Sequence, residues 1–158
     1  MPDGKSGASS AGHLELEHFL PYRLSVLTNR VSAALAREYQ STFGLSVPEW
    51  RVMAVLGRFG PAAATRICER TAMDKVTVSR ATKSMQSRDL MTARIDADDR
   101  RRTIFALTRA GQRIHDEIVP FALAHEAELL AALEPSEVEQ LDRLLTKLQT
   151  CADKLKAR

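Results

Sequence analysis

The sequence predicts a mainly α-helical protein that carries one small β-hairpin. Its 158 residues are 44% hydrophobic and 27% charged, which suits one domain with a single core. Only 5% of the residues are aromatic, and the strong helix formers Ala, Leu and Arg recur throughout. Apolar residues fall at steps of three and four along most of the chain, which is the period of a helix that buries one face.

The first 13 residues are small and polar, so we expect a flexible N-terminal tail there. They lack the apolar stretch of a secretory signal peptide, and no later run is apolar for long enough to span a bilayer. We therefore expect a cytoplasmic protein that has no membrane partner.

A first long helix is predicted from about Glu15 to Thr42, with Pro21 in its first turns. Gly44 is placed to end this helix, because glycine readily adopts the positive φ that follows many helices. The apolar stripe of the helix consists of Leu20, Leu24, Leu27, Val31 and Leu35.

The second helix begins after Ser46, a capping serine that is followed by Pro48 in the first turn and by Glu49 three residues on. Gly60 and Pro61 end it. It is short and apolar, which predicts a place in the core. Its apolar residues are Trp50, Val52, Met53, Val55 and Leu56.

Two short helices with a tight junction follow, the first over residues 64–71 and the second from a capping Asp74 to about residue 89. Such a pair is a candidate helix-turn-helix. The side chains expected on the buried sides of the two helices are Ile67, Cys68, Val76, Ala81 and Met85.

The period then changes to that of strands. Residues 90–95 and 103–107 are β-prone runs, and the polar loop 96–102 between them makes a hairpin with a charged tip. A helix pair followed by a hairpin is the layout of a winged helix-turn-helix, in which the second helix enters the major groove of DNA and the hairpin reaches phosphates or the minor groove.

Thr108 is placed to cap a long helix, and Pro135 to open a last one. Both helices and the first one carry apolar stripes, which a domain of this size cannot cover alone. We expect residues 14–44 and 112–158 to form a dimerisation body beside the winged part at 45–111, with a second subunit as the cover. Alternatively, the three helices fold back on one another within one chain.

The net charge of +3 is unevenly distributed along the chain. Residues 65–113 hold twelve Lys and Arg against six acids, whereas the remaining residues hold eleven against fourteen. The middle of the chain is therefore a candidate surface for binding a polyanion, although a solvated basic surface would have the same composition. The candidate DNA contacts are Lys75, Thr77, Ser79, Arg80, Lys83 and Ser84 on the second short helix, and Asp99, Arg100, Arg101 and Arg102 at the hairpin tip.

Three segments resemble the MarR family of bacterial transcriptional regulators. Residues 99–111 (DRRRTIFALTRAG) are similar to the wing signature of that family, residues 69–80 (ERTAMDKVTVSR) to the entry of its recognition helix, and residues 47–53 (VPEWRVM) to its second helix. The likeness extends from about Leu20 to Leu148. Because the three segments occur in the family's order and at its separations, chance similarity is improbable.

The resemblance implies a homodimer that grips a pseudo-palindromic operator and represses transcription until a small molecule releases it. It implies that Arg101 enters the minor groove, that Asp99 braces Arg101, and that the recognition helix contacts DNA through Thr77, Ser79, Arg80 and Lys83. The sequence departs from the family pattern at three positions. Arg102 stands where a small residue is usual, Ala72 replaces a frequent glycine, and Ala63 stands where a capping hydroxyl is common.

In such proteins the effector would lie between the dimerisation helices and the winged part. The polar residues at plausible places are His18, Tyr22, Arg23, Arg51 and His115. An arginine and a tyrosine together suit an aromatic carboxylate, and residues 19–27 resemble a subgroup that regulates aromatic-acid catabolism, so an aromatic acid or its thioester is the expected effector. Alternatively, Tyr22 packs at the dimer interface and Arg51 pairs with an acid.

Other chemistry has little support in the sequence. Cys68 and Cys151 cannot form a four-ligand zinc site with the histidines, so we expect neither a metal nor a cofactor. We expect Cys68 to be a structural thiol, and Cys151 has only two lysines near it to activate it. Catalytic triads, phosphate-binding loops and paired catalytic carboxylates are not evident, so we do not expect an enzyme. The competing hypothesis is a winged-helix module that docks another protein without sequence-specific DNA binding.

Overall fold

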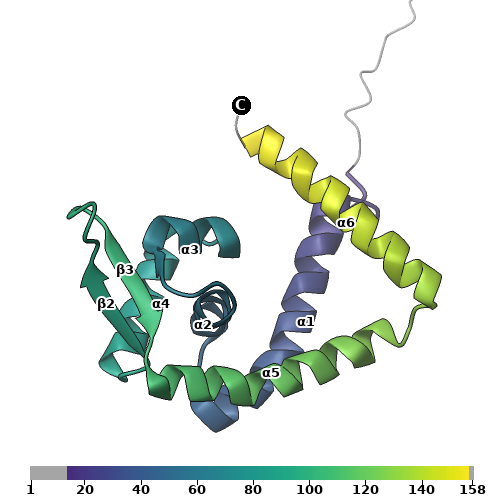
Figure 1. Cartoon of the computed structure of the whole chain (residues 1–158). Helices are drawn as coiled ribbons and strands as arrows, with labels where there is room; N and C mark the ends of the chain where they lie inside the picture. Colours follow the sequence, from purple (N-terminus) through teal and green to yellow (C-terminus); the bar gives the residue numbers. More distant parts are fainter. Residues whose placement is uncertain (1–13, 157–158) are drawn as a thin grey trace, which may run out of the picture.

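The computed structural model describes residues 14–156 and has the predicted mainly α-helical winged fold (Figure 1). The predicted flexible tail at 1–13 lies outside the described residues. The elements in chain order are α1 (Leu20–Phe43), α2 (Val47–Phe59), β1 (Ala62–Ala63), α3 (Ala64–Thr71), α4 (Lys75–Ser87), β2 (Met91–Ile95), β3 (Thr103–Leu107), α5 (Arg109–Leu130) and α6 (Pro135–Lys156).

Helix α1 begins five residues later than the sequence predicts, at Leu20 instead of Glu15. The reason is Pro21, which lacks an N–H group and whose ring would clash with a carbonyl one turn earlier if it stood inside a helix. In the observed helix Pro21 lies in the first turn, where neither effect arises. The predicted end is confirmed, since Gly44 adopts a left-handed conformation with φ of 64°.

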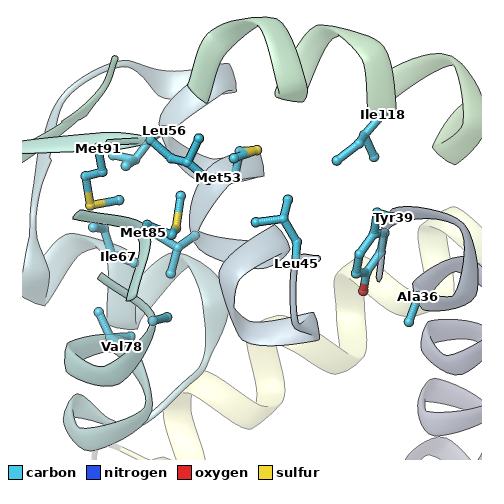
Figure 2. Close-up of a cluster of buried hydrophobic side chains, with 13 residues drawn as sticks. Ala36, Tyr39, Leu45, Met53, Leu56, Ile67, Val78, Met85, Met91 and Ile118 are labelled. Carbon is cyan, nitrogen blue, oxygen red and sulfur yellow. The ribbon is translucent and has the colours of Figure 1, made fainter. Parts of the chain in front are cut away.

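The core of the winged part lies where α2, α3 and α4 meet the sheet (Figure 2). Val76 was expected inside this core, and that prediction is wrong, because its side chain is 59% exposed. The buried positions of α4 are Val78, Ala81, Thr82 and Met85, and Val76 is two residues from Val78, which places it on the opposite side of the helix. Figure 2 shows the same core continuing through Leu45 to Tyr39 and Ile118, from α1 and α5.

The sheet has three strands in the order β1-β3-β2, one more than the predicted hairpin. The additional strand β1 has only two residues, and Ala63 pairs with Ile104 in β3. Two alanines carry neither the β-branched nor the aromatic side chains that identify a strand in sequence, so β1 is defined by its partner and not by its own residues. The predicted hairpin is confirmed, with Met91 opposite Leu107 and Ile95 opposite Thr103.

The base of the wing is fixed where α5 begins. The Thr108 hydroxyl accepts the Gly111 N–H at 3.0 Å as the predicted cap, and donates to the Asp89 carbonyl at 2.7 Å. A side chain at position 111 would collide with the Leu90 carbonyl oxygen, so α5 can approach the start of β2 this closely only with glycine there. The Thr108 and Gly111 spacing is therefore a packing requirement of the wing.

Two departures from the family pattern affect the turns around α3. Ala63 precedes α3 and makes no side-chain cap, since alanine has no hydrogen-bonding group. Ala72 follows α3 in the left-handed region with φ of 55°, where glycine would avoid a steric penalty of about 1 kcal/mol. The turn is therefore formed with alanine at a strained position.

The long helices keep exposed apolar side chains. In α6 Val138 is partly buried, while the other side chains described there are exposed. The stripes do not cover one another within the described part of one subunit, which argues against the folded-back alternative. The exposed large apolar residues include Leu20, Leu24 and Leu27 of α1, Phe121, Leu123 and Leu129 of α5, and Leu141, Leu144, Leu145, Leu148 and Leu155 of α6. Among the described residues, no helix combines the length and the apolar character needed to cross a membrane.

Candidate nucleic-acid interface

The first turn of α4 is held by Asp74. Its carboxylate accepts the Thr77 N–H at 2.8 Å and the Thr77 hydroxyl at 2.7 Å. These two hydrogen bonds stabilise the ionised form and hold the pKa of Asp74 below its ordinary value. The hydroxyl of Thr77, a predicted DNA contact, therefore donates its proton to the cap.

The outer face of α4 is cationic. Lys75, Ser79, Arg80 and Lys83 are all exposed, whereas the opposite face carries the buried Val78, Ala81 and Met85. Positions 79, 80 and 83 are separated by one, three and four residues, so these side chains share one side of the helix. This side offers hydrogen-bond donors that match phosphates and the acceptors on base edges.

Ser84, another predicted DNA contact, hydrogen-bonds within the protein. Its hydroxyl donates to Glu49 Oε1 at 2.6 Å, although the residue itself is exposed at the surface. The sequence identified Glu49 as part of a capping box, which the structure confirms, since Glu49 also accepts the Ser46 N–H at 2.7 Å. Its contact with Ser84 joins residues 35 positions apart, which local pattern analysis does not detect.

Glu49 is 5% exposed and is a charged group within the α2–α4 contact. Burial acts to raise its pKa, but hydrogen bonds from Ser84 and Ser46 and the positive charge of Arg88 outweigh burial, so the pKa of Glu49 lies below its ordinary value of 4.5. Arg88 approaches Glu49 at 3.9 Å and also donates to the carbonyls of Phe43 and Gly44. Arg88 thus contributes to internal packing, although the sequence counts it in the basic segment.

The wing loop is ordered by its aspartates. Asp99 Oδ1 accepts the backbone N–H of Arg101 at 3.0 Å, so Asp99 braces the backbone of the loop and not the guanidinium of Arg101. Asp96, which was not among the predicted residues, lies 4.0 Å from Arg102 Nε. Arg100 and Arg101 are exposed at the tip. Figure 1 shows this hairpin together with α3 and α4 at the end of the subunit that is far from α6.

Two of the five predicted effector residues, Arg51 of α2 and His115 of α5, each contact a neighbouring helix at the junction of α1, α2 and α5. Arg51 Nη2 donates to Ser32 Oγ at 3.4 Å, and His115 stacks on Trp50 with ring centroids 6.1 Å apart. Gly57 leaves room for this ring, since a side chain there would collide with the imidazole. The alternative expectation was that Arg51 pairs with an acid. In the structure the Arg51 side chain instead donates this hydrogen bond to Ser32.

Titratable groups surround this junction. Burial raises the pKa of the Tyr39 hydroxyl, partly opposed by the charge of Arg51. Hydrogen bonds from His115 at 2.9 Å and from Gln112 at 2.8 Å lower the pKa of Asp116. The charge of Arg51 therefore acts on Tyr39, whose ring lies 5.8 Å from that of Trp50, which in turn stacks on His115.

The other three predicted effector residues lie elsewhere in the subunit. His18 precedes α1, and Tyr22 and Arg23 lie in its first turns, where they line a groove with other residues of α1. Ten residues separate Tyr22 from Ser32, which corresponds to about 15 Å along a helix. One subunit therefore does not bring the five residues into a single pocket, because α1 is long and straight enough to separate its start from the junction.

The remaining candidate sites are the two cysteines and possible metal-binding clusters. Cys68 is partly buried and packs against the core, as expected for a structural thiol, and Cys151 is exposed. Clusters of His, Cys, Asp or Glu that would suit a metal ion are absent from the described residues.

Comparison with known proteins finds transcriptional regulators of the MarR family and of the HTH type. Residues 43–102 match the profile of the MarR family. The HTH-type transcriptional regulator YwaE of Bacillus subtilis (strain 168) is 26% identical over 131 residues, which cover 79% of this chain and 77% of the relative. The HTH-type transcriptional repressor NicR of Pseudomonas putida is 26% identical over 96 residues, 61% of each chain.

Among solved structures, a MarR/EmrR family transcriptional regulator from Acinetobacter sp. ADP1 superposes with a TM-score of 0.82 and 26% identity, over 89% of this chain and 99% of the other. Bordetella bronchiseptica BpsR, described as regulated in DNA binding by 6-hydroxynicotinic acid, superposes with a TM-score of 0.77 and 24% identity, over 87% of this chain and 98% of the other.

The lowered pKa of Glu49 predicts a loss of stability in acid. The folded state binds a proton at the Glu49 carboxylate less tightly than the unfolded chain does. The stabilisation of the fold by ionised Glu49 is therefore complete above the pKa of the unfolded chain, near 4.5, and is lost as the pH falls through the lower pKa of the folded state. We expect Glu49→Gln to reduce the decline in unfolding free energy between about pH 5.5 and pH 3, measured by urea unfolding. Glu117→Gln, an exposed site on α5, controls for the loss of one carboxylate. Equal decline in the wild type and Glu49→Gln would contradict the assignment.

Proposed function

Because the chain belongs to the MarR family of transcriptional regulators, we propose that it is a homodimeric repressor whose hold on its operator is released by a small aromatic acid. DNA binding and transcription regulation are the functions of this family. The observation that supports the operator-binding mode is the exposed cationic face of α4, with the arginine-tipped wing at the same end of the subunit.

In the proposed complex α4 lies in the major groove. Lys75, Ser79, Arg80 and Lys83 contact bases and phosphates there, and Arg100, Arg101 and Arg102 of the wing contact the adjacent minor groove and backbone. Thr77, Ser84 and Asp99 position these groups, because their hydroxyl or carboxylate groups hold the first turn of α4, its contact with α2, and the wing loop.

Residues 14–44 and 112–158 form the dimerisation body in this proposal, and residues 45–111 form the DNA-binding part. The exposed leucines of α1 and α6 support the assignment, since a partner subunit would remove them from water. A dimer would also place two copies of α4 on one duplex, as a pseudo-palindromic operator requires.

For the effector, we place the carboxylate of an aromatic acid at Arg51 and its ring beside Trp50 and His115. Arginine can bind a carboxylate through two parallel hydrogen bonds, and the stacked rings offer an apolar face. His18, Tyr22 and Arg23 would reach an effector only from elsewhere in the assembly. The regulation of BpsR by 6-hydroxynicotinic acid is a property of that protein, and it makes this acid a suitable first probe here.

Loss of Arg101 should weaken DNA binding. We expect Arg101→Ala to reduce the affinity for a duplex selected from a random pool by about 1–3 kcal/mol, which is the scale of one good contact. Fluorescence anisotropy at matched salt measures the change. Arg143→Ala, on α6 and outside the winged part, should bind as the wild type does. Unchanged binding by Arg101→Ala would exclude the role, and a wild type that binds no duplex even at low salt would favour the protein-docking alternative.

The dimer is tested at Leu148. This side chain is 43% exposed in one subunit, so Leu148→Glu should leave the subunit folded but place a charge in the interface. We expect the wild type to sediment at twice 17.5 kDa and Leu148→Glu to shift toward 17.5 kDa at micromolar concentration. Gln149→Glu adds the same charge one position away and is the control. A wild type that sediments as one subunit would refute the dimer.

The effector site is tested at Arg51. We expect 6-hydroxynicotinate or benzoate to release the wild type from the selected duplex, and Arg51→Ala to require roughly tenfold or more of the acid, as the loss of a charged hydrogen bond predicts. Arg58→Ala, an exposed arginine one to two turns along α2, is the control. Release of both variants at the same concentration would place the effector elsewhere, and failure of all aromatic acids and thioesters would refute the effector class.

A further inference from the structure

Val76 is an apolar side chain on the outer surface of α4. It is 59% exposed, more than half of its accessible surface, in the first turns of the helix. Valine is also a weaker helix former than alanine because its branched side chain loses rotamer freedom in a helix. Neither the core nor the local stability of α4 therefore explains a valine at this position.

The other large apolar side chains that are more than half exposed in the described winged part are Phe59 and Ile95. Phe59 lies beneath Arg70, whose guanidinium carbon is 3.5 Å from the ring centroid, and Arg58 lies at 5.5 Å. Ile95 ends β2 and pairs with Thr103 beside the wing loop. Val76 differs from both because it stands on the helix that we propose for the major groove.

The neighbours of Val76 on the helix surface are polar and cationic. Positions 76, 79, 80 and 83 follow the three-and-four spacing of one helical face, so Val76 shares its face with Arg80 and Lys83. That face is directed away from the buried Val78 and Met85. A ligand bound by the cations of this face would therefore also meet the valine.

The first turn of a recognition helix is the part that contacts base edges. In α4 the Thr77 hydroxyl of this turn already donates to Asp74 at 2.7 Å, so the side-chain groups left to face a base here are the Lys75 ammonium and the two methyl groups of Val76. On the major-groove edges of the four bases, the apolar group is the C5-methyl of thymine.

We propose that Val76 contacts a thymine methyl group in the major groove, and that it selects an A·T base pair at one position in each operator half-site. The inference rests on the proposed DNA-binding mode of α4. It adds a residue that determines sequence preference to the cationic contacts that supply most of the affinity.

The test removes the methyl group from each partner in turn. A high-affinity duplex is selected from a random pool with the full-length wild type, and each thymine is then replaced by deoxyuridine, which lacks only the C5-methyl. For one thymine in each half-site we expect the wild type to lose about fourfold in affinity, as expected for one methyl group removed from an apolar contact. Val76→Ala should bind the parent duplex more weakly and should show no further loss with deoxyuridine.

Two controls isolate the contact. Ile95→Ala shortens another exposed apolar side chain of the winged part and should keep the deoxyuridine penalty. Circular dichroism of Val76→Ala should match the wild type, because alanine favours the helix; Val76→Thr, which keeps one methyl, supplies a second readout and should keep part of the penalty.

The outcomes separate the two levels of inference. Wild type that binds no selected duplex would refute the proposed function. Wild type that binds tightly but tolerates deoxyuridine at every position would overturn the role of Val76 alone. The role of Val76 would also be overturned if Val76→Ala lost as much affinity as the wild type on replacement of thymine by deoxyuridine. A selected site without thymine in its half-sites would overturn it as well.

Discussion

The orientation of α4 depends on one buried carboxylate. Glu49 accepts hydrogen bonds from the N-terminus of its own helix and from Ser84 of α4, and Arg88 extends the contact to the last carbonyls of α1. A charge this deeply buried is tolerated only because its oxygens are paired, and removal of a partner would leave an unpaired polar group. Three helices are thereby held together by side chains that local sequence patterns assign to capping or to the basic surface.

Helix α5 joins the two regions that a ligand-controlled regulator must couple. At its start, the contact of Gly111 with the Leu90 carbonyl fixes the base of the wing, and about one turn later His115 lies against Gly57 and Trp50 of α2. A molecule that displaced His115 would therefore act on the helix that carries the wing. This gives the proposed release a physical route, because an effector can shift a conformation only through contacts that differ between the two states.

The features that could be predicted from the sequence are those that arise within a few residues. The caps at Ser46, Asp74 and Thr108 each bond a backbone N–H three positions along, so the pattern of residues specifies the contact. Strand β1 could not be predicted because its pairing depends on β3, about 40 residues away. Val76 was misplaced because an apolar residue on a short helix suggests burial, whereas the three-residue step from Val78 to Ala81 defines the buried face. Similarly, the five effector candidates shared a polar character but not a location, since the length of α1 separates them.

The turn between α3 and α4 shows how a departure from the family pattern is accommodated. Ala72 is left-handed, which for alanine costs about 1 kcal/mol that glycine would avoid. On one side of Ala72, the Thr71 hydroxyl donates to the Ile67 carbonyl at 2.7 Å and accepts the Met73 N–H at 3.3 Å; on the other, Asp74 caps α4. Because these neighbours define the turn on both sides, the strained residue has little freedom to relax, and the buried Ile67 and Val78 hold the two helices together. The placement of α4 is therefore determined by its neighbours and not by the conformational freedom of the turn residue. For this reason alanine can occupy the usual position of glycine without disrupting the packing of α3 against α4.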